Sequence, residues 1–167
     1  TKKKNLLITG GNTNQSFNIL KNITNYMNSK SLSFVNKVYL DEKLLPDKPP
    51  SFMEKFNYQK SQFDDIMACI CRPGLGIISD CIEHNIKLFT VFEENNLEMQ
   101  HNAKIVNNIG IGEHLRSNNF LPIERYFDNY KIFVEENNLK CSSIKMDGCQ
   151  NVYSFLMKDF TKNKKLK

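Results

Sequence analysis

Long apolar runs, tryptophan and a recognisable leader segment are all missing from this 167-residue sequence. No stretch approaches the roughly eighteen apolar residues of a membrane-spanning helix, so we expect none. The chain begins with Thr1 and three lysines and passes directly into a strand-like pattern, which is not the composition of a signal peptide. We therefore expect a cytoplasmic chain. Because Thr1 is not methionine, we also expect a processed chain or an excised piece of a longer one.

The five cysteines form no C-x-x-C pair, and their odd number argues against a disulfide framework. Cys69 and Cys71 alternate within one strand-like run, so both point to the same face, where we expect burial as small apolar side chains. The histidines are not spaced as metal ligands relative to the cysteines. The sequence therefore predicts reduced thiols and no metal site.

The net charge of +5 comes mostly from the two ends of the chain. Seven of the 23 basic residues are terminal lysines, and without them the net charge becomes −2. A basic groove for nucleic acid is therefore not expected. The length predicts one domain with a proper core, which we place over residues 1–163 and follow with a basic tail over 164–167.

Short apolar runs alternate with segments of helical periodicity along the chain. The predicted strands cover residues 5–9, 35–40, 66–71 and 87–92, with a further short strand at 56–58. The predicted helices cover residues 16–28, 76–84, 97–108, 121–137 and 151–162, with a helical turn at 61–65. This alternation predicts an α/β fold, a Rossmann-like open parallel sheet flanked by helices.

Right-handed crossovers place the C-terminal ends of all strands on one edge of such a sheet, where ligands bind. The loops that follow residues 8, 71 and 92 meet at this edge, and they are polar or glycine-rich. In the first of them, residues 9–16 offer free backbone N–H groups and a helix N-terminus, which suit a diphosphate. The alternative is a plain turn between strand and helix, since neither a Walker motif nor Gly-x-Gly-x-x-Gly is present.

The other two loops carry side chains that suit a nucleotide sugar. Gly74 and Gly76 allow a ligand to come close, and the Asp80 carboxylate could accept two hydrogen bonds from a ribose diol. Asp80 could equally be an acid that complements the helix dipole. Glu98, Gln100 and Asn102 suit the hydroxyl groups of a sugar, or they simply open a helix as polar residues often do.

The pattern Arg72-Pro73-Gly74-x-Gly76-x-x-x-Asp80, followed by Glu98-x-Gln100-x-Asn102-Ala103 and Gly110-Ile111-Gly112, resembles the C-terminal, donor-binding domain of GT-B glycosyltransferases. It is most similar to the bacterial UDP-N-acetylglucosamine transferase of lipid II synthesis and its relatives, glycosyltransferase family 28. The resemblance covers residues 6–115 and implies a single donor-type domain. Three positions depart from the family pattern: Asp80 replaces a glutamate, Ile77 a threonine, and Met99-Gln100 a tandem Gln-Gln.

The resemblance implies that a nucleotide-diphosphate sugar, expected to be a UDP-sugar, binds without a metal or other cofactor. The first loop would face the diphosphate, residues 56–58 the nucleobase, Asp80 the ribose and the 98–102 cluster the transferred sugar. The residues assigned to donor binding are Gly10, Gly11, Asn12, Thr13, Gln15, Tyr58, Arg72, Gly74, Gly76, Asp80, Glu98, Gln100 and Asn102.

A complete GT-B enzyme also has an acceptor domain, which commonly supplies the catalytic base. The resemblance therefore implies an acceptor domain in the same polypeptide or a partner subunit, with peripheral membrane association through that partner. No catalytic residue is assigned in this chain, and His101 is the one histidine worth testing. The alternatives are a nucleotide-sugar hydrolase or epimerase on the same scaffold, and a sugar-nucleotide-binding module without chemistry.

Overall fold

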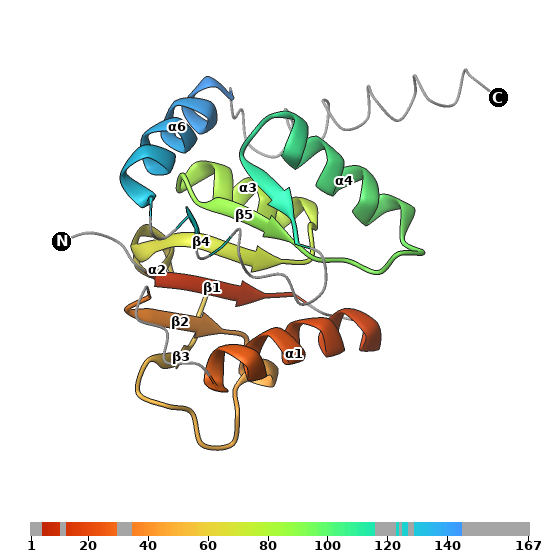
Figure 1. Ribbon diagram of the computed structural model, residues 1–167, viewed down its shortest axis with the longest axis vertical. Helices are drawn as coiled ribbons and strands as arrows, with labels where there is room; N and C mark the ends of the chain where they lie inside the picture. The colour runs from red at the N-terminus through yellow and green to blue at the C-terminus, as the bar shows by residue number, and fades with distance from the viewer. Residues whose placement is uncertain are drawn as a thin grey trace.

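The computed structural model describes residues 5–10, 13–29, 35–115, 123, 125–126 and 129–144. Within them, six strands form one sheet in the order β3-β2-β1-β4-β5-β6, and every neighbouring pair is parallel (Figure 1). The strands are β1 (Asn5–Thr9), β2 (Lys37–Leu40), β3 (Met53–Lys55), β4 (Ile66–Cys71), β5 (Lys87–Thr90) and β6 (Gly112–His114). The helices are α1 (Asn14–Ser29), α2 (Lys60–Asp65), α3 (Leu75–Glu83), α4 (Leu97–Asn108) and α6 (Tyr130–Ser143), with a short 3-10 helix η1 (Glu42–Leu44).

Alternation along the strands gives the sheet a separate apolar core on each face. In β1, Leu6 and Ile8 pack into one core with residues of α1, whereas Leu7 packs into the other core with residues of α2, α3 and α6. Because successive strand residues point to opposite faces, a continuous apolar run is what a strand covered on both sides requires. Helices on both faces of an open parallel sheet confirm the predicted fold class.

Several predicted elements have the predicted bounds. β4 and α4 coincide with the predictions, and α1 and α3 begin and end within two residues of theirs. β2 begins two residues later than predicted, and β5 ends at Thr90, two residues earlier.

Two predicted elements are wrong. The short strand lies at Met53–Lys55 and not at 56–58, because Tyr58 has a φ of 56°, a left-handed conformation that a strand does not contain. The single helix over 121–137 is also wrong in extent. The chain turns at Asn129, and α6 runs from Tyr130 to Ser143. The predicted helix over 151–162 and the predicted tail over 164–167 lie outside the described residues.

The cysteines Cys69, Cys71, Cys81 and Cys141 are free and buried, and all four belong to the same core. Cys69 and Cys71 share a face, as predicted. Burial raises the pKa of the Cys141 thiol to about 11, so this thiol stays protonated at neutral pH. Among the described helices, none combines the length and apolar character needed to cross a membrane.

Gly112 lies so close to its neighbours that no residue with a Cβ atom would fit there without a shift. A Cβ atom at this position in β6 would lie 2.6 Å from the Leu88 carbonyl oxygen and would also overlap Val106 of α4. We expect Gly112→Ala to lower the free energy of unfolding by about 1–3 kcal/mol, since the backbone of β5 would have to shift. Urea denaturation measures the change.

Gly76→Ala is the matched control for this prediction. A Cβ atom at Gly76 in α3 would have no neighbour within 4 Å. Because alanine favours a helix over glycine, this variant should be as stable as the parent or more stable by up to about 1 kcal/mol. A Gly112→Ala chain as stable as Gly76→Ala would contradict the close packing of β6 against β5 and α4.

Candidate functional site

A pocket of about 370 Å³ opens at the C-terminal edge of the sheet, beside the ends of β1 and β4. This is the point at which the strand order reverses direction, where open α/β sheets bind their ligands. Four loops meet there, those that follow β1, β2, β3 and β4. The lining residues are Thr9, Gly10, Asp41, Tyr58, Arg72, Gly74, Gly76, Ile77 and Asp80.

Asp41 ties three of these loops together. Its carboxylate accepts a hydrogen bond of 2.8 Å from the Gly10 backbone N–H and one of 2.9 Å from the Thr9 hydroxyl. The Tyr58 hydroxyl donates a third, of 2.5 Å. The N–H group of Gly10, predicted to face a diphosphate, therefore already has a carboxylate as its partner.

Tyr58 is held in an unusual conformation at the rim of the pocket. Its φ of 56° is rare for a bulky residue, and such a conformation persists where the surroundings fix it. Asp41 and Thr9 both hold its hydroxyl, and its ring packs against Phe56 with centroids 4.6 Å apart. Burial and the hydrogen bond to Asp41 raise the pKa of Tyr58 to about 12. The residue as a whole is nevertheless 56% exposed, so Tyr58 is accessible to a ligand at the rim of the pocket.

The N-terminus of α3 forms the opposite wall of the pocket. Gly74 is the N-cap residue, and no side chain caps this helix. The amides of the first turn have no acceptor within their own helix, and the helix dipole makes them attractive to an anion. Gly76 and Ile77, which belong to this turn, line the pocket.

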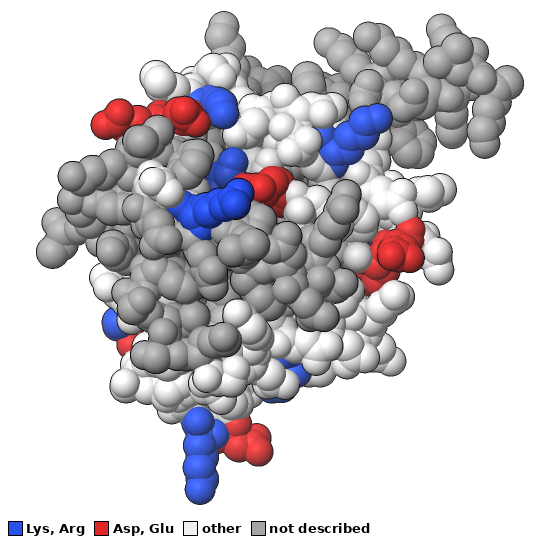
Figure 2. Space-filling model, in the orientation of Figure 1, with Lys and Arg blue, Asp and Glu red and all other residues white. Residues whose placement is uncertain are grey.

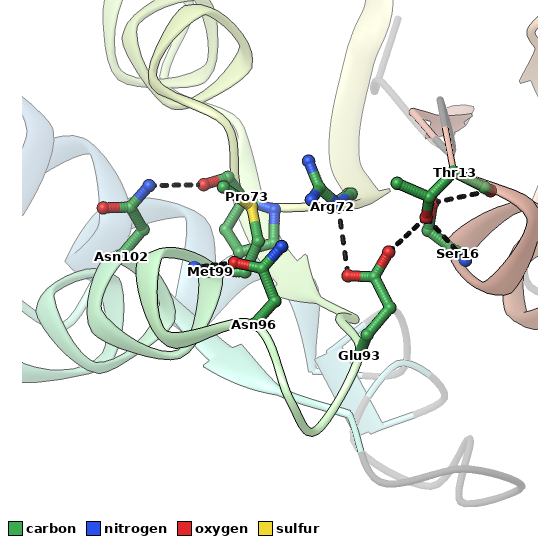
Figure 3. A network of polar contacts seen from close by, with 8 residues as sticks. All are labelled: Thr13, Ser16, Arg72, Pro73, Glu93, Asn96, Met99 and Asn102. Carbon is green, nitrogen blue, oxygen red and sulfur yellow. Dashed lines mark hydrogen bonds and ion pairs between the residues drawn. The ribbon is translucent and has the colours of Figure 1, made fainter.

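Asn102 keeps the turn before α3 in place. It is buried in α4, and its side-chain amide donates a 2.9 Å hydrogen bond to the Pro73 carbonyl oxygen (Figure 3). Asn102 therefore supports the loop between β4 and α3 from behind and is not among the residues that line the pocket.

Arg72 is the one cation among the described residues that line the pocket. Its Nε lies 3.2 Å from the Glu93 carboxylate, and Glu93 also accepts a hydrogen bond from the Thr13 hydroxyl (Figure 3). Thr13 in turn accepts a hydrogen bond from the Ser16 backbone N–H in the first turn of α1. This network joins the loops that follow β1, β4 and β5.

Asp80 lies in the second turn of α3 and faces the pocket. Burial raises the pKa of its carboxyl group, the nearby Glu83 adds to this, and His84 opposes it. A partly buried carboxylate beside an open pocket can accept hydrogen bonds from hydroxyl groups of a ligand, as the sequence suggested for a ribose.

The structure brings six of the predicted residues to one place, four of them from the second predicted loop. Those that line the pocket are Gly10, Tyr58, Arg72, Gly74, Gly76 and Asp80. Gly11 and Asn12 lie outside the described residues. Thr13 takes part in the Arg72–Glu93 network, and Gln15 is exposed in the first turn of α1.

The third predicted cluster does not reach the pocket. Glu98 is exposed at the start of α4, and the Gln100 side chain donates to the Glu94 carbonyl oxygen. His101, the histidine proposed for testing, lies in the same helix and also does not line the pocket. These residues belong to α4, which follows β5, whereas the pocket is bounded by α3 and the loops that follow β1 to β4.

The donor-binding residues assigned from the sequence did not include Thr9, Asp41, Ile77 or Glu93, although the first predicted loop began at Thr9 and Ile77 was noted as a departure from the family pattern. Asp41 directly follows β2, so parallel pairing of that strand places it at the ligand edge. Its position directly after a predicted strand was therefore a usable signal in the sequence. Glu93 was read as part of a polar loop, although only 6% of it is exposed.

No protein-family model matches the sequence. No curated protein matches it either. Solved structures do match in fold. The glycotransferase of kitacinnamycin aligns with a TM-score of 0.62 and 12% identity over 93% of this chain and 43% of its own. SnogD from Streptomyces nogalater aligns with a TM-score of 0.61 and 13% identity, again over 93% and 43%. SsfS6 from Streptomyces sp. SF2575, complexed with thymidine diphosphate, aligns with a TM-score of 0.56 and 16% identity over 86% and 38%.

These likenesses show the fold. The chain shares the α/β architecture of these glycosyltransferases, a parallel sheet flanked by helices as the sequence predicted, and it spans about two-fifths of their length. At identities of 12–16% they do not single out the lipid II transferase among GT-B proteins.

Asp41→Ala tests whether this carboxylate holds the pocket together. Removing it leaves the Gly10 N–H and the Thr9 and Tyr58 hydroxyl groups without their acceptor. We expect the free energy of unfolding in urea to fall by about 1–3 kcal/mol. Asp47→Ala, an exposed change in the following loop, should leave stability within about 0.5 kcal/mol of the parent. Equal stability of the two variants would show that Asp41 is not a structural anchor.

Proposed function

We propose that the chain is the donor-binding domain of a glycosyltransferase, and that its pocket holds the nucleoside diphosphate part of a UDP-sugar. One observation carries the proposal. The uncapped N-terminus of α3, the Arg72 cation and the Asp80 carboxylate line the same pocket at the switch point of a parallel sheet. A ligand that carries both a diphosphate and a sugar diol needs an anion-binding helix N-terminus, a cation and a hydrogen-bond acceptor in one pocket.

The diphosphate is assigned to the α3 side of the pocket. The first turn of α3 lines the pocket and no side chain caps it, so its amides are available to an anion, and Arg72 adds a positive charge. When the glycosidic bond to the donor breaks, negative charge grows on the departing diphosphate. Fixed N–H groups and a guanidinium stabilise that charge more than they stabilise the bound donor, which lowers the barrier to transfer. In this proposal no metal ion is required.

The nucleoside is assigned to the space between Asp80 and Tyr58. The Asp80 carboxylate accepts hydrogen bonds from the ribose hydroxyl groups. The exposed ring of Tyr58, fixed by Asp41 and Phe56, provides a flat surface beside the nucleobase. SsfS6, which has this fold, is complexed with thymidine diphosphate, and this supports a nucleoside diphosphate as the ligand class.

The binding site for the acceptor substrate is assigned to a second domain or subunit. The chain spans about two-fifths of the glycosyltransferases that it matches, so an acceptor domain or a partner subunit would complete the active site. A relationship to the lipid II transferase, transfer of an N-acetylhexosamine and membrane association through the partner are part of the same proposal.

Incubation with radiolabelled UDP-N-acetylglucosamine and other UDP-sugars tests the function, with and without a candidate acceptor domain and with EDTA in a parallel reaction. We expect binding by the chain alone and transfer only when the partner is present, with and without EDTA. Free sugar released by the chain alone would instead indicate a hydrolase. Binding without turnover in every condition would indicate a binding module.

Asp80→Ala tests the ribose contact. We expect the affinity for UDP, measured by calorimetry, to weaken by about 1–3 kcal/mol, the usual effect of losing hydrogen bonds to a charged group. The parent should also prefer UDP to its 2′-deoxy analogue, and Asp80→Ala should lose that preference. Glu83→Ala, an exposed change one turn further along α3, is the control and should bind UDP like the parent. Unchanged affinity in Asp80→Ala would remove Asp80 from the site.

A further inference from the structure

Glu93 is a buried acid that the proposed binding of a nucleotide does not use directly. It follows β5, and only 6% of it is exposed. One carboxylate oxygen faces the Arg72 Nε at 3.2 Å, and the other accepts from the Thr13 hydroxyl. Figure 3 shows Glu93 reaching up between the two, from a loop that lies far from both in the sequence.

The environment of Glu93 keeps it charged. Burial by itself raises the pKa of this carboxyl group, but hydrogen bonds from Thr13, from its own backbone amide and from Arg72 outweigh burial, so the pKa is lowered. A charged carboxylate in a buried place is stable only while its partners remain. The Arg72 guanidinium is therefore bound to a fixed anion on its Nε side.

This arrangement matters because Arg72 has a long side chain with several rotatable bonds. Holding such a side chain in one orientation costs conformational entropy, which the binding of a ligand would otherwise have to offset. Arg72 is 21% exposed, and its one described polar contact is made through Nε, so the two terminal nitrogens remain for a ligand. Those nitrogens match the oxygen spacing of a phosphate group.

We infer that Glu93 is a positioning residue, which fixes the Arg72 guanidinium so that its terminal nitrogens bind the diphosphate of the nucleotide. The inference rests on the proposed function and adds a specific consequence. Glu93 contributes to the recognition of the diphosphate and not to recognition of the nucleoside, because the nucleoside is assigned to the space between Asp80 and Tyr58, neither of which Glu93 contacts.

NMR titration of the labelled chain with UDP and with uridine separates these contributions. In Glu93→Gln we expect UDP to bind about tenfold more weakly, while uridine binds within about twofold of the parent. Glu94→Gln is the matched control, since Glu94 is the exposed neighbour of Glu93 in the same loop and its side chain has no described partner. It should change neither affinity.

Arg72→Lys provides the second arm. A lysine cannot keep one nitrogen on Glu93 and present two others in the same plane. We expect this variant to lose UDP affinity as well, and Glu93→Gln to have little further effect in the Arg72→Lys background, since both changes act on the same contact. Independent, additive losses would overturn the inference.

The remaining outcomes are also decisive. If UDP and uridine weaken by the same factor in Glu93→Gln, Glu93 only supports the fold, and the inference fails while the proposed function stands. If Glu93→Gln does not fold, as judged by its thermal transition, Arg72→Lys alone must show the selective loss of UDP affinity, and an equal loss of both ligands overturns the inference. If the parent binds neither ligand, the proposed function fails, and the inference fails with it.

Discussion

The parallel pairing of β1 with β4 is the constraint on which the whole ligand edge depends. Thr9 pairs with Cys71, so the loops that leave these residues start side by side. A Cβ atom at Gly10 would lie 3.2 Å from the Arg72 Cβ, and the φ of Gly10 is +106°, a combination that only glycine tolerates without strain. Pairing of Ile8 with Leu40 then places Asp41 on the other side of Gly10. The register of two strands thus fixes which side chains share the pocket.

The acidic residues at this edge decide which loop can receive an anion. The loop after β1 was the expected diphosphate site, yet its Gly10 N–H donates to Asp41 and its Thr13 hydroxyl donates to Glu93. Each carboxylate already satisfies a donor that a phosphate would otherwise contact. The N-terminus of α3 has no such internal anion. The charge distribution therefore moves the favoured anion position toward α3 and Arg72.

Local sequence signals predicted much of the fold and only part of the site. β4 was predicted with its correct bounds because all of its residues are apolar and buried. α4 was equally clear, since Asn96 caps its start and Gly110, with a φ of 77°, follows its end. The bend at Tyr58 was missed because a left-handed tyrosine depends on tertiary contacts and leaves no mark in the sequence. Glu93 was missed for a similar reason, since its partner Thr13 lies 80 residues away.

The proposed function requires a pocket with little positive charge to select a nucleotide. Asp41, Asp80 and Arg72 are the charged groups among the described residues that line the pocket, so these side chains carry no net positive charge to attract a diphosphate over long range. Under the proposed function, selection then comes from directional contacts, namely the amides of α3, the Arg72 guanidinium and the Asp80 carboxylate. Directional contacts act only when their donors are held in place beforehand. That requirement gives a physical role to the contacts of Glu93 with Arg72 and Thr13, and to the separate hydrogen bond from Asn102 to Pro73.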